Sequence, residues 1–168
     1  RHSVRVTDGE NKLVQRKVSE SQLSADAVER GEFRHYMLKE IYEQPRALGD
    51  TLSERIADGQ VLDGIFGPKA SDILDKIEHV QIVACGTSYH AGLIARYWIE
   101  EYCKVPCSVE IASEYRYRNA VVPPNSVFMT VSQSGETADT LAAVRSAKAK
   151  GYLATMAICN VPESSLVR

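Results

Sequence analysis

Two segments of this chain repeat one order of features: an apolar strand, a short loop rich in hydroxyl side chains, and a helix. The first has an apolar run over 80–85, followed by Gly86-Thr87-Ser88 and then by apolar residues at helical spacing. The second has an apolar run over 127–131, followed by six polar loop residues over 132–137 and another helical pattern. Two such units in succession predict parallel strands joined by helices.

The helical patterns and the remaining apolar runs predict the fold class. Helices are expected over 89–102 and 138–150, the second ended by Gly151. Further strands are expected over 107–111 and 152–159. The chain is therefore predicted to be an α/β protein, with a doubly wound parallel sheet flanked by helices on both faces.

The first part of the chain has a different pattern. Residues 3–15 predict a β-hairpin arm with a turn at Asp8-Gly9, and the polar residues 19–32 predict a linker. Three helices are then expected before the sheet, over 36–43, over 48–57 after Pro45, and over 70–77.

The second hydroxyl loop has the chemistry of an anion site. The first turn of a helix has four backbone N–H groups without intrahelical acceptors and carries partial positive charge. Ser132, Ser134 and Thr137 can add hydroxyl donors, so the loop suits a phosphate. Taken alone, these residues are equally compatible with ordinary helix caps. The other hydroxyl loop, with Thr87 and Ser88, is expected at the same edge of the sheet, where open α/β sheets bind ligands.

Other functional motifs are absent or incomplete. No lysine follows Gly135, so nothing indicates a triphosphate with magnesium, and no G-x-G-x-x-G indicates a dinucleotide. Gly86 to His90 resembles a nucleophile elbow, but a histidine replaces its final glycine and no later histidine exists. The four cysteines and four histidines have no metal-ligand spacing. We therefore expect no serine hydrolase, no metal and no cofactor.

Charge and hydropathy exclude two classes of partner. The net charge of −2 gives no electrostatic basis for nucleic-acid binding, despite one basic-aromatic cluster at Tyr115-Arg116-Tyr117-Arg118. No run of about eighteen apolar residues exists and no signal peptide opens the chain, so membrane partners are not expected. A cytoplasmic protein with reduced thiols is expected.

The combined motifs resemble one known family. Residues 84–89, 110–118 and 132–140 match, in order and spacing, the glucosamine-6-phosphate synthases, also called glutamine–fructose-6-phosphate aminotransferases (isomerizing). Residues 35–45 and 157–161 match them as well. The resemblance covers essentially the whole chain, whereas a generic sugar-isomerase (SIS) domain would share only the two serine loops.

The resemblance implies a domain organisation. The family makes glucosamine 6-phosphate from fructose 6-phosphate, with ammonia from glutamine and no cofactor. Residues 1–20 would be the last strands of its glutaminase domain, 21–34 the interdomain linker, and 35–168 the first SIS subdomain. The chain would end one strand short of a five-stranded SIS sheet.

The resemblance also implies site residues. The phosphate-binding residues carry over to Ser132, Gln133, Ser134 and Thr137, and contacts to the sugar carry over to Thr87 and Ser88. The cysteine nucleophile of the glutaminase would precede this chain, and the isomerase's glutamate, histidine and lysines would lie far downstream. The chain alone is therefore expected to hold part of a binding site, no catalytic residue and no activity.

Partners follow from the same resemblance, and two alternatives stay open. The expected partners are a sugar phosphate, the remainder of the same enzyme, and a second copy, because family members are commonly homodimers. One alternative is a non-catalytic SIS module that senses a phosphosugar. Another is a purely structural α/β domain whose serines and threonines only cap helices.

Overall fold

The computed structural model describes residues 5–15, 29–53 and 55–168. The chain divides into two compact units, Arg1–Glu54 and Arg55–Arg168. Within the described ranges, no helix is long and apolar enough to cross a membrane.

The predicted hairpin arm is present in the described part of the first unit. Thr7 and Leu13 form an antiparallel bridge. The carboxylate of Asp8 accepts hydrogen bonds from the backbone N–H groups of Glu10 and Lys12, at 3.0 and 2.9 Å. These local bonds close the turn, as aspartate side chains commonly do. The start of the hairpin at residues 3–4 and residues 19–28 of the linker predicted over 19–32 lie outside the described residues.

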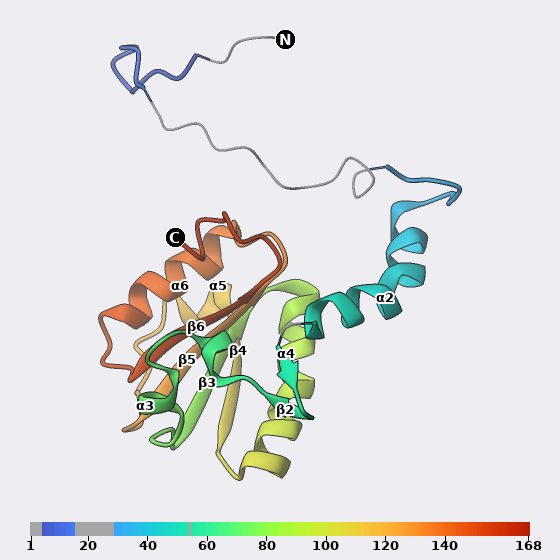
Figure 1. Ribbon diagram of the computed structural model, residues 1–168. Coiled ribbons are helices and arrows are strands. Elements are labelled where there is room, and N and C mark those ends of the chain that lie inside the picture. The colour runs from blue at the N-terminus through green and yellow to red at the C-terminus, as the bar shows by residue number, and fades with distance from the viewer. Residues whose placement is uncertain (1–4, 16–28, 54) are drawn as a thin grey trace. The chain divides into compact units, whose positions relative to one another are not determined.

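The two helices predicted around Pro45 are one helix, so the prediction of a second helix over 48–57 is wrong. Helix α2 runs over Tyr36–Leu52 with Pro45 inside it. Proline lacks an N–H donor and crowds the preceding turn, which bends a helix without always ending it. Figure 1 shows the axis of α2 changing direction along its length.

A short hairpin replaces the end of that predicted helix. Strands β1 (Ile56–Ala57) and β2 (Gln60–Val61) pair antiparallel. Asp58 and Gly59 between them have φ angles of 52° and 74°. An Asp-Gly pair with both φ angles positive is a two-residue hairpin turn. The Asp58-Gly59 pair is a turn signal in the sequence that the helix prediction over 48–57 did not take into account.

The sheet confirms the predicted fold class. Its four strands are all parallel and have the order β4-β3-β5-β6. They are β3 (His79–Ala84), β4 (Cys107–Ile111), β5 (Ser126–Ser132) and β6 (Ala154–Cys159). Each lies within two residues of its predicted range, because short apolar runs bounded by polar turns mark buried strands clearly.

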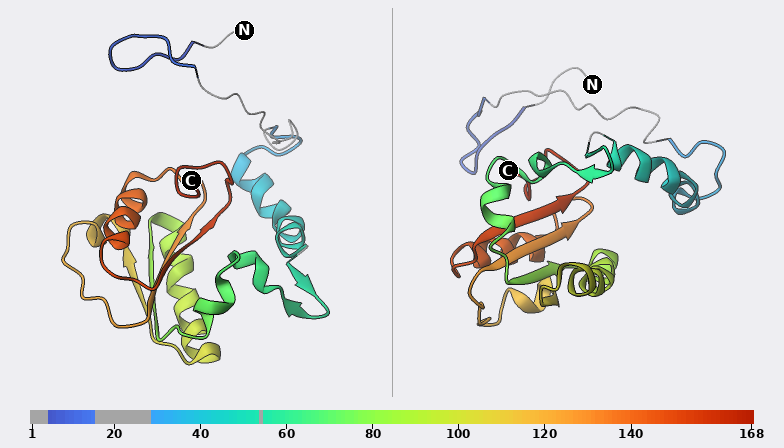
Figure 2. Two further views of the ribbon diagram at one scale, coloured as in Figure 1. Left: turned by 60° about the vertical axis from the view of Figure 1, so that its left-hand side comes forward. Right: turned by 60° about the horizontal axis from the view of Figure 1, so that its bottom comes forward.

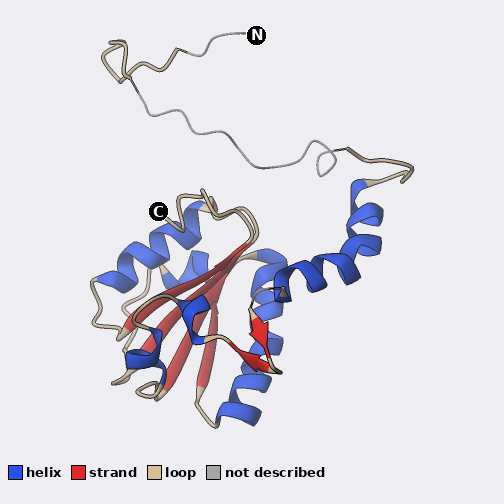
Figure 3. Cartoon of the chain, in the orientation of Figure 1, coloured by secondary structure: helices blue, strands red, loops and turns tan. Residues whose placement is uncertain are grey.

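Helices connect and flank these strands, as Figure 3 shows. Before the sheet stand a 3₁₀ turn, η1 (Asp63–Phe66), and helix α3 (Ala70–Leu74), which ends three residues earlier than expected. The connections within the sheet are α4 (Gly86–Trp98) continued by a π-helical turn, η2 (Ile99–Cys103), then α5 (Ala112–Tyr115) and α6 (Ala138–Lys148).

The hydrophobic core has two parts, one on each face of the sheet. Val83 and Phe128 pack with residues of α5 and α6 in one cluster. Ile82 packs with residues of α4 and η2 in the other. Neighbouring strand residues alternate between faces because successive side chains of a strand point in opposite directions. Figures 1 and 2 show α4 on one face and α5 with α6 on the other.

The order of the strands positions the site. The chain leaves β3, forms β4 on one side of it, and then returns to form β5 on its other side. In doubly wound sheets, such a reversal leaves a crevice at the carboxyl ends of the two central strands. Here those ends are paired in register, with Ala84 opposite Val131. The two hydroxyl loops therefore begin side by side, although about 45 residues separate them in the sequence.

Candidate ligand-binding site

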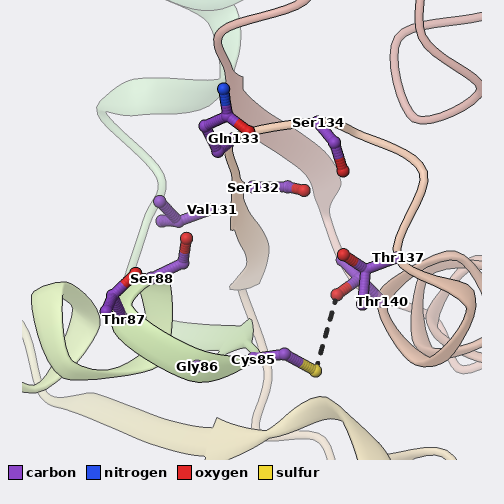
Figure 4. Close-up of a pocket in the computed structure, with 10 residues that line it drawn as sticks. All are labelled: Cys85, Gly86, Thr87, Ser88, Val131, Ser132, Gln133, Ser134, Thr137 and Thr140. Carbon is purple, nitrogen blue, oxygen red and sulfur yellow. Dashed lines mark hydrogen bonds between the residues drawn. The ribbon is translucent and has the colours of Figure 1, made fainter. Parts of the chain in front are cut away.

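A pocket of about 280 Å³ opens at this crevice. Figure 4 shows the residues of the two loops around it, with α4 on one side and α6 on the other. It is lined by Cys85, Gly86, Thr87, Ser88, Val131, Ser132, Gln133, Ser134, Thr137 and Thr140. All six predicted site residues are thus brought together; that they bind a ligand stays a prediction.

The first loop is a direct passage from strand to helix. Cys85 is extended, and Gly86 adopts a φ of +57°, which turns the chain sharply into α4. Thr87 and Ser88 therefore occupy the first turn, where the backbone N–H groups lack intrahelical acceptors. Figure 4 shows their side chains on the side of α4 that borders the pocket. This loop offers two hydroxyls and the start of a helix.

The second loop is held by its own serines. The Ser132 hydroxyl accepts a hydrogen bond from the Gly135 N–H at 3.0 Å, and the Ser134 hydroxyl accepts one from the Glu136 N–H at 3.2 Å. Ser132 is buried, so its bond is shielded from water. A hydroxyl that accepts a bond still has its own hydrogen to donate. Both serines can thus fix the loop and donate to a bound anion at the same time.

Thr137 separates the ligand-site reading from the helix-cap reading. It is the N-cap residue of α6, with an extended backbone, yet its side chain makes no capping hydrogen bond in the described structure. Figure 4 shows its hydroxyl near that of Thr140, at the pocket. An ordinary N-cap threonine bonds a backbone N–H of the first turn. The arrangement of Thr137 favours a hydroxyl that is available to a ligand.

Four lining residues were not predicted as site residues: Cys85, Gly86, Val131 and Thr140. Thr140 is 2% exposed and donates a long hydrogen bond to the Cys85 sulfur, at 3.9 Å. The pair connects α6 to the first loop across the floor of the pocket. The signal for Thr140 was its spacing, because a residue three positions after Thr137 lies on the same face of a helix. Cys85 carried no signal beyond its place at the end of a strand.

The pocket has no charged lining side chain among the ten described residues that form it. The only positive charge expected at the pocket from its lining is the partial charge of the first turns of α4 and α6. Asp139 in the first turn of α6 would oppose that potential, but its carboxylate is paired with Arg116 at 2.5 Å. The site is therefore suited to an anion held by N–H and O–H donors. Fold and pocket together define an α/β domain with a hydroxyl-lined crevice at its strand reversal.

Comparison with known proteins gives the family. The SIS domain model matches residues 73–168, and the chain belongs to the SIS domain family. Over all 168 residues, the chain is 60% identical to the glutamine–fructose-6-phosphate aminotransferases [isomerizing] of Shewanella oneidensis and of Vibrio cholerae. It spans 28% of the length of each.

A solved structure agrees with these relatives. The C-terminal domain of glucosamine-fructose-6-phosphate aminotransferase from Francisella tularensis is 57% identical, with a TM-score of 0.78 over 82% of this chain and 38% of that one. The resemblance inferred from the sequence motifs is therefore confirmed, including its extent over the whole chain.

Proposed function

We propose that this chain is part of a glutamine–fructose-6-phosphate aminotransferase and that its pocket holds the phosphate of fructose 6-phosphate. The observation that carries the proposal is the meeting of two hydroxyl loops and two helix starts in one pocket. The chain's 60% identity to enzymes named for that substrate supports the choice of ligand.

The second loop supplies the phosphate contacts in this proposal. A phosphate dianion accepts hydrogen bonds from Ser132, Ser134 and Thr137, and from backbone N–H groups at the start of α6. Gln133 lines the same pocket and can donate through its side-chain amide. Because the serines already hold the loop in shape, little ordering is required when the ligand binds.

The first loop supplies contacts to the sugar. Thr87 and Ser88 face the second loop across the pocket, and hydroxyls both donate to and accept from sugar hydroxyls. None of the ten described lining residues carries a carboxylate, imidazole or amine that could move a proton or form an imine. This chain therefore binds and orients the substrate, and residues elsewhere in the whole enzyme perform the chemistry.

The whole protein has further parts in this proposal. A glutaminase domain, of which residues 1–20 are the last strands, releases ammonia from glutamine, and the complete cytoplasmic enzyme works as a homodimer on fructose 6-phosphate. The relatives' match over the full chain favours this over a sensing SIS module. Residues 1–72 lie outside the SIS model but inside the aligned region, and an SIS module alone would not account for them.

The proposal is tested by calorimetric titration of the chain with fructose 6-phosphate, after circular dichroism has confirmed the fold. Inorganic phosphate should compete, and unphosphorylated fructose should not bind. Each hydroxyl bonded to the phosphate contributes about 1.5–3 kcal/mol, so Ser132→Ala and Thr137→Ala should each weaken binding roughly 10- to 100-fold.

A matched variant controls for the loss of a hydroxyl. Ser146→Ala removes one from the same helix, α6, at a position outside the pocket lining, and should bind as the unmodified chain does. Equal affinity of the Thr137→Ala and Ser146→Ala variants would contradict the phosphate site. Binding of fructose as tight as that of fructose 6-phosphate would do the same.

A further inference from the structure

An acidic residue stands inside the candidate anion loop. Glu136 lies between Gly135 and Thr137, two positions before the first residue of α6. A carboxylate there complements the partial positive charge at the helix start, but it also repels a phosphate bound a few ångströms away. Glu136 adjoins the residues that line the pocket and is not one of them. The hydrogen bonds of Glu136 instead connect the loop to another segment of the chain.

Glu136 bonds the last segment of the chain, residues 161–168. Its Oε1 accepts a hydrogen bond from the Ser165 N–H at 2.7 Å. The neighbouring Leu166 N–H donates to the Gly135 carbonyl at 3.1 Å. Two successive residues of the loop thus hold two successive residues of this segment. The bonds from Ser165 and the charge of Arg168 hold the pKa of Glu136 below its ordinary value, so the carboxylate is ionised at neutral pH.

The segment is itself held by local hydrogen bonds and by the buried side chain of Ser164. Ser164 is 2% exposed, and its hydroxyl lies 3.4 Å from the Cys159 sulfur. Backbone bonds from Ser164 to Val161 and from Val167 to Ser164 close its turns. A methyl group added at Gly135 would meet Ser164, which shows how closely loop and segment approach. Glu136 therefore ties the loop to a fixed support at the end of β6.

We infer that Glu136 is a positioning residue, which holds the anion loop in its binding shape by anchoring that loop to residues 161–168. This inference rests on the proposed function of the pocket. It predicts that removing the Glu136 side chain weakens phosphate binding, whereas the charge of Glu136 alone predicts tighter binding. Removing a negative charge beside a phosphate site should tighten binding if only electrostatics matters. Removing the anchor should weaken it, because the loop must then be ordered by the ligand.

The test compares three variants of the chain in titrations with fructose 6-phosphate and with inorganic phosphate. Glu136→Ala should weaken both ligands by the same factor, roughly 5- to 30-fold, because the loop meets the phosphate. Glu136→Gln keeps an oxygen acceptor for Ser165 and should stay within about 3-fold of the unmodified chain. Glu163→Ala removes an exposed acid from the same segment and should leave both affinities unchanged.

The outcomes separate the anchor from general destabilisation and from the proposed function. Equal or tighter binding by Glu136→Ala overturns the inference, as does an equal loss in Glu136→Gln. Amide hydrogen exchange rates measured without ligand report directly on the contact between Glu136 and residues 161–168. In Glu136→Ala the Gly135 and Ser165 N–H groups should exchange faster, while core amides such as that of Phe128 stay protected. If the unmodified chain binds neither ligand, the proposed function fails; unchanged exchange at Gly135 then overturns the anchor independently.

Discussion

The two hydroxyl loops share a sequence pattern but are built differently. The first turns at once from β3 into α4, with Gly86 as its one residue of positive φ. The second takes four residues between β5 and the N-cap position of α6, and its shape depends on Ser132, Ser134 and the contact with residues 161–168. A short loop is defined by the elements that it joins, whereas a longer one needs its own bonds. The second loop should therefore be much more sensitive to substitution.

Alanine substitutions at Gly135 in the second loop and Gly86 in the first give the largest expected difference in stability between the loops. An alanine at Gly135, where φ is +66°, would place its Cβ 2.1 Å from the Ser164 hydroxyl and 2.7 Å from the Cys159 sulfur. We expect Gly135→Ala to lower the free energy of unfolding by about 2–4 kcal/mol and to abolish phosphate binding. At Gly86, with φ of +57°, nothing lies within 4 Å, so Gly86→Ala should cost only the backbone strain of about 1–2 kcal/mol. Urea denaturation measures both, and equal losses would contradict the comparison.

Alanine substitutions at Ser132 in the second loop and Ser88 in the first give a smaller difference in stability. Ser132→Ala leaves the Gly135 N–H without its acceptor in a buried position, which costs about 1–3 kcal/mol of stability. The hydroxyl of Ser88 makes no hydrogen bond to another described residue, so Ser88→Ala should change stability by less than about 0.5 kcal/mol. Both variants should lose affinity for fructose 6-phosphate in calorimetry. A stability loss in Ser88→Ala as large as that in Ser132→Ala would show that the first loop is also held by its hydroxyl.

The smallest effect is a pH dependence confined to the second loop. The pKa of Glu136 is held below its ordinary value of 4.5, chiefly by the hydrogen bond from the Ser165 backbone. A lowered pKa means that the anchor contributes fully above about pH 4.5 and is lost as the pH falls through the lowered value. Protection of the Ser165 amide, corrected for its intrinsic exchange rate, should fall over this range in the unmodified chain and stay level in Glu136→Gln. Parallel curves for the two proteins would mean that the carboxylate does not hold the segment.

Local sequence patterns predicted the sheet strands and the meeting of the two hydroxyl loops, whereas Gln133 was named only through the family resemblance and α5 was not predicted. Strands such as 80–85 are short apolar runs between polar turns, and a run of this kind has few alternatives to a buried strand. The helix at Pro45 was wrongly divided because proline weakens a helix by an amount that packing can offset. The Asp58-Gly59 turn was missed because the residues around it also fit a helical period.

Contacts between distant residues could not be predicted in this way. Glu136 looked like a residue that complements a helix start, and nothing in the sequence pairs it with Ser165, about 30 positions later. Cys85 and Thr140 meet across the pocket only because β3 and β5 are neighbours. A pattern read along the chain reports which elements form, but the partners of a polar side chain depend on how those elements are arranged.

The reversal of strand order has a consequence for how the protein is made. During synthesis, β3 and α4 emerge first and then β4, which covers one edge of β3 and leaves its other edge bare. Only the loop after β3 can line the pocket until β5 pairs with that bare edge. The second loop gains its contact with residues 161–168 only when these residues have left the ribosome. An unpaired edge in a nascent chain is a target for aggregation. If the pocket binds a sugar phosphate as proposed, the ligand stabilises only the finished arrangement and not the partly made chain.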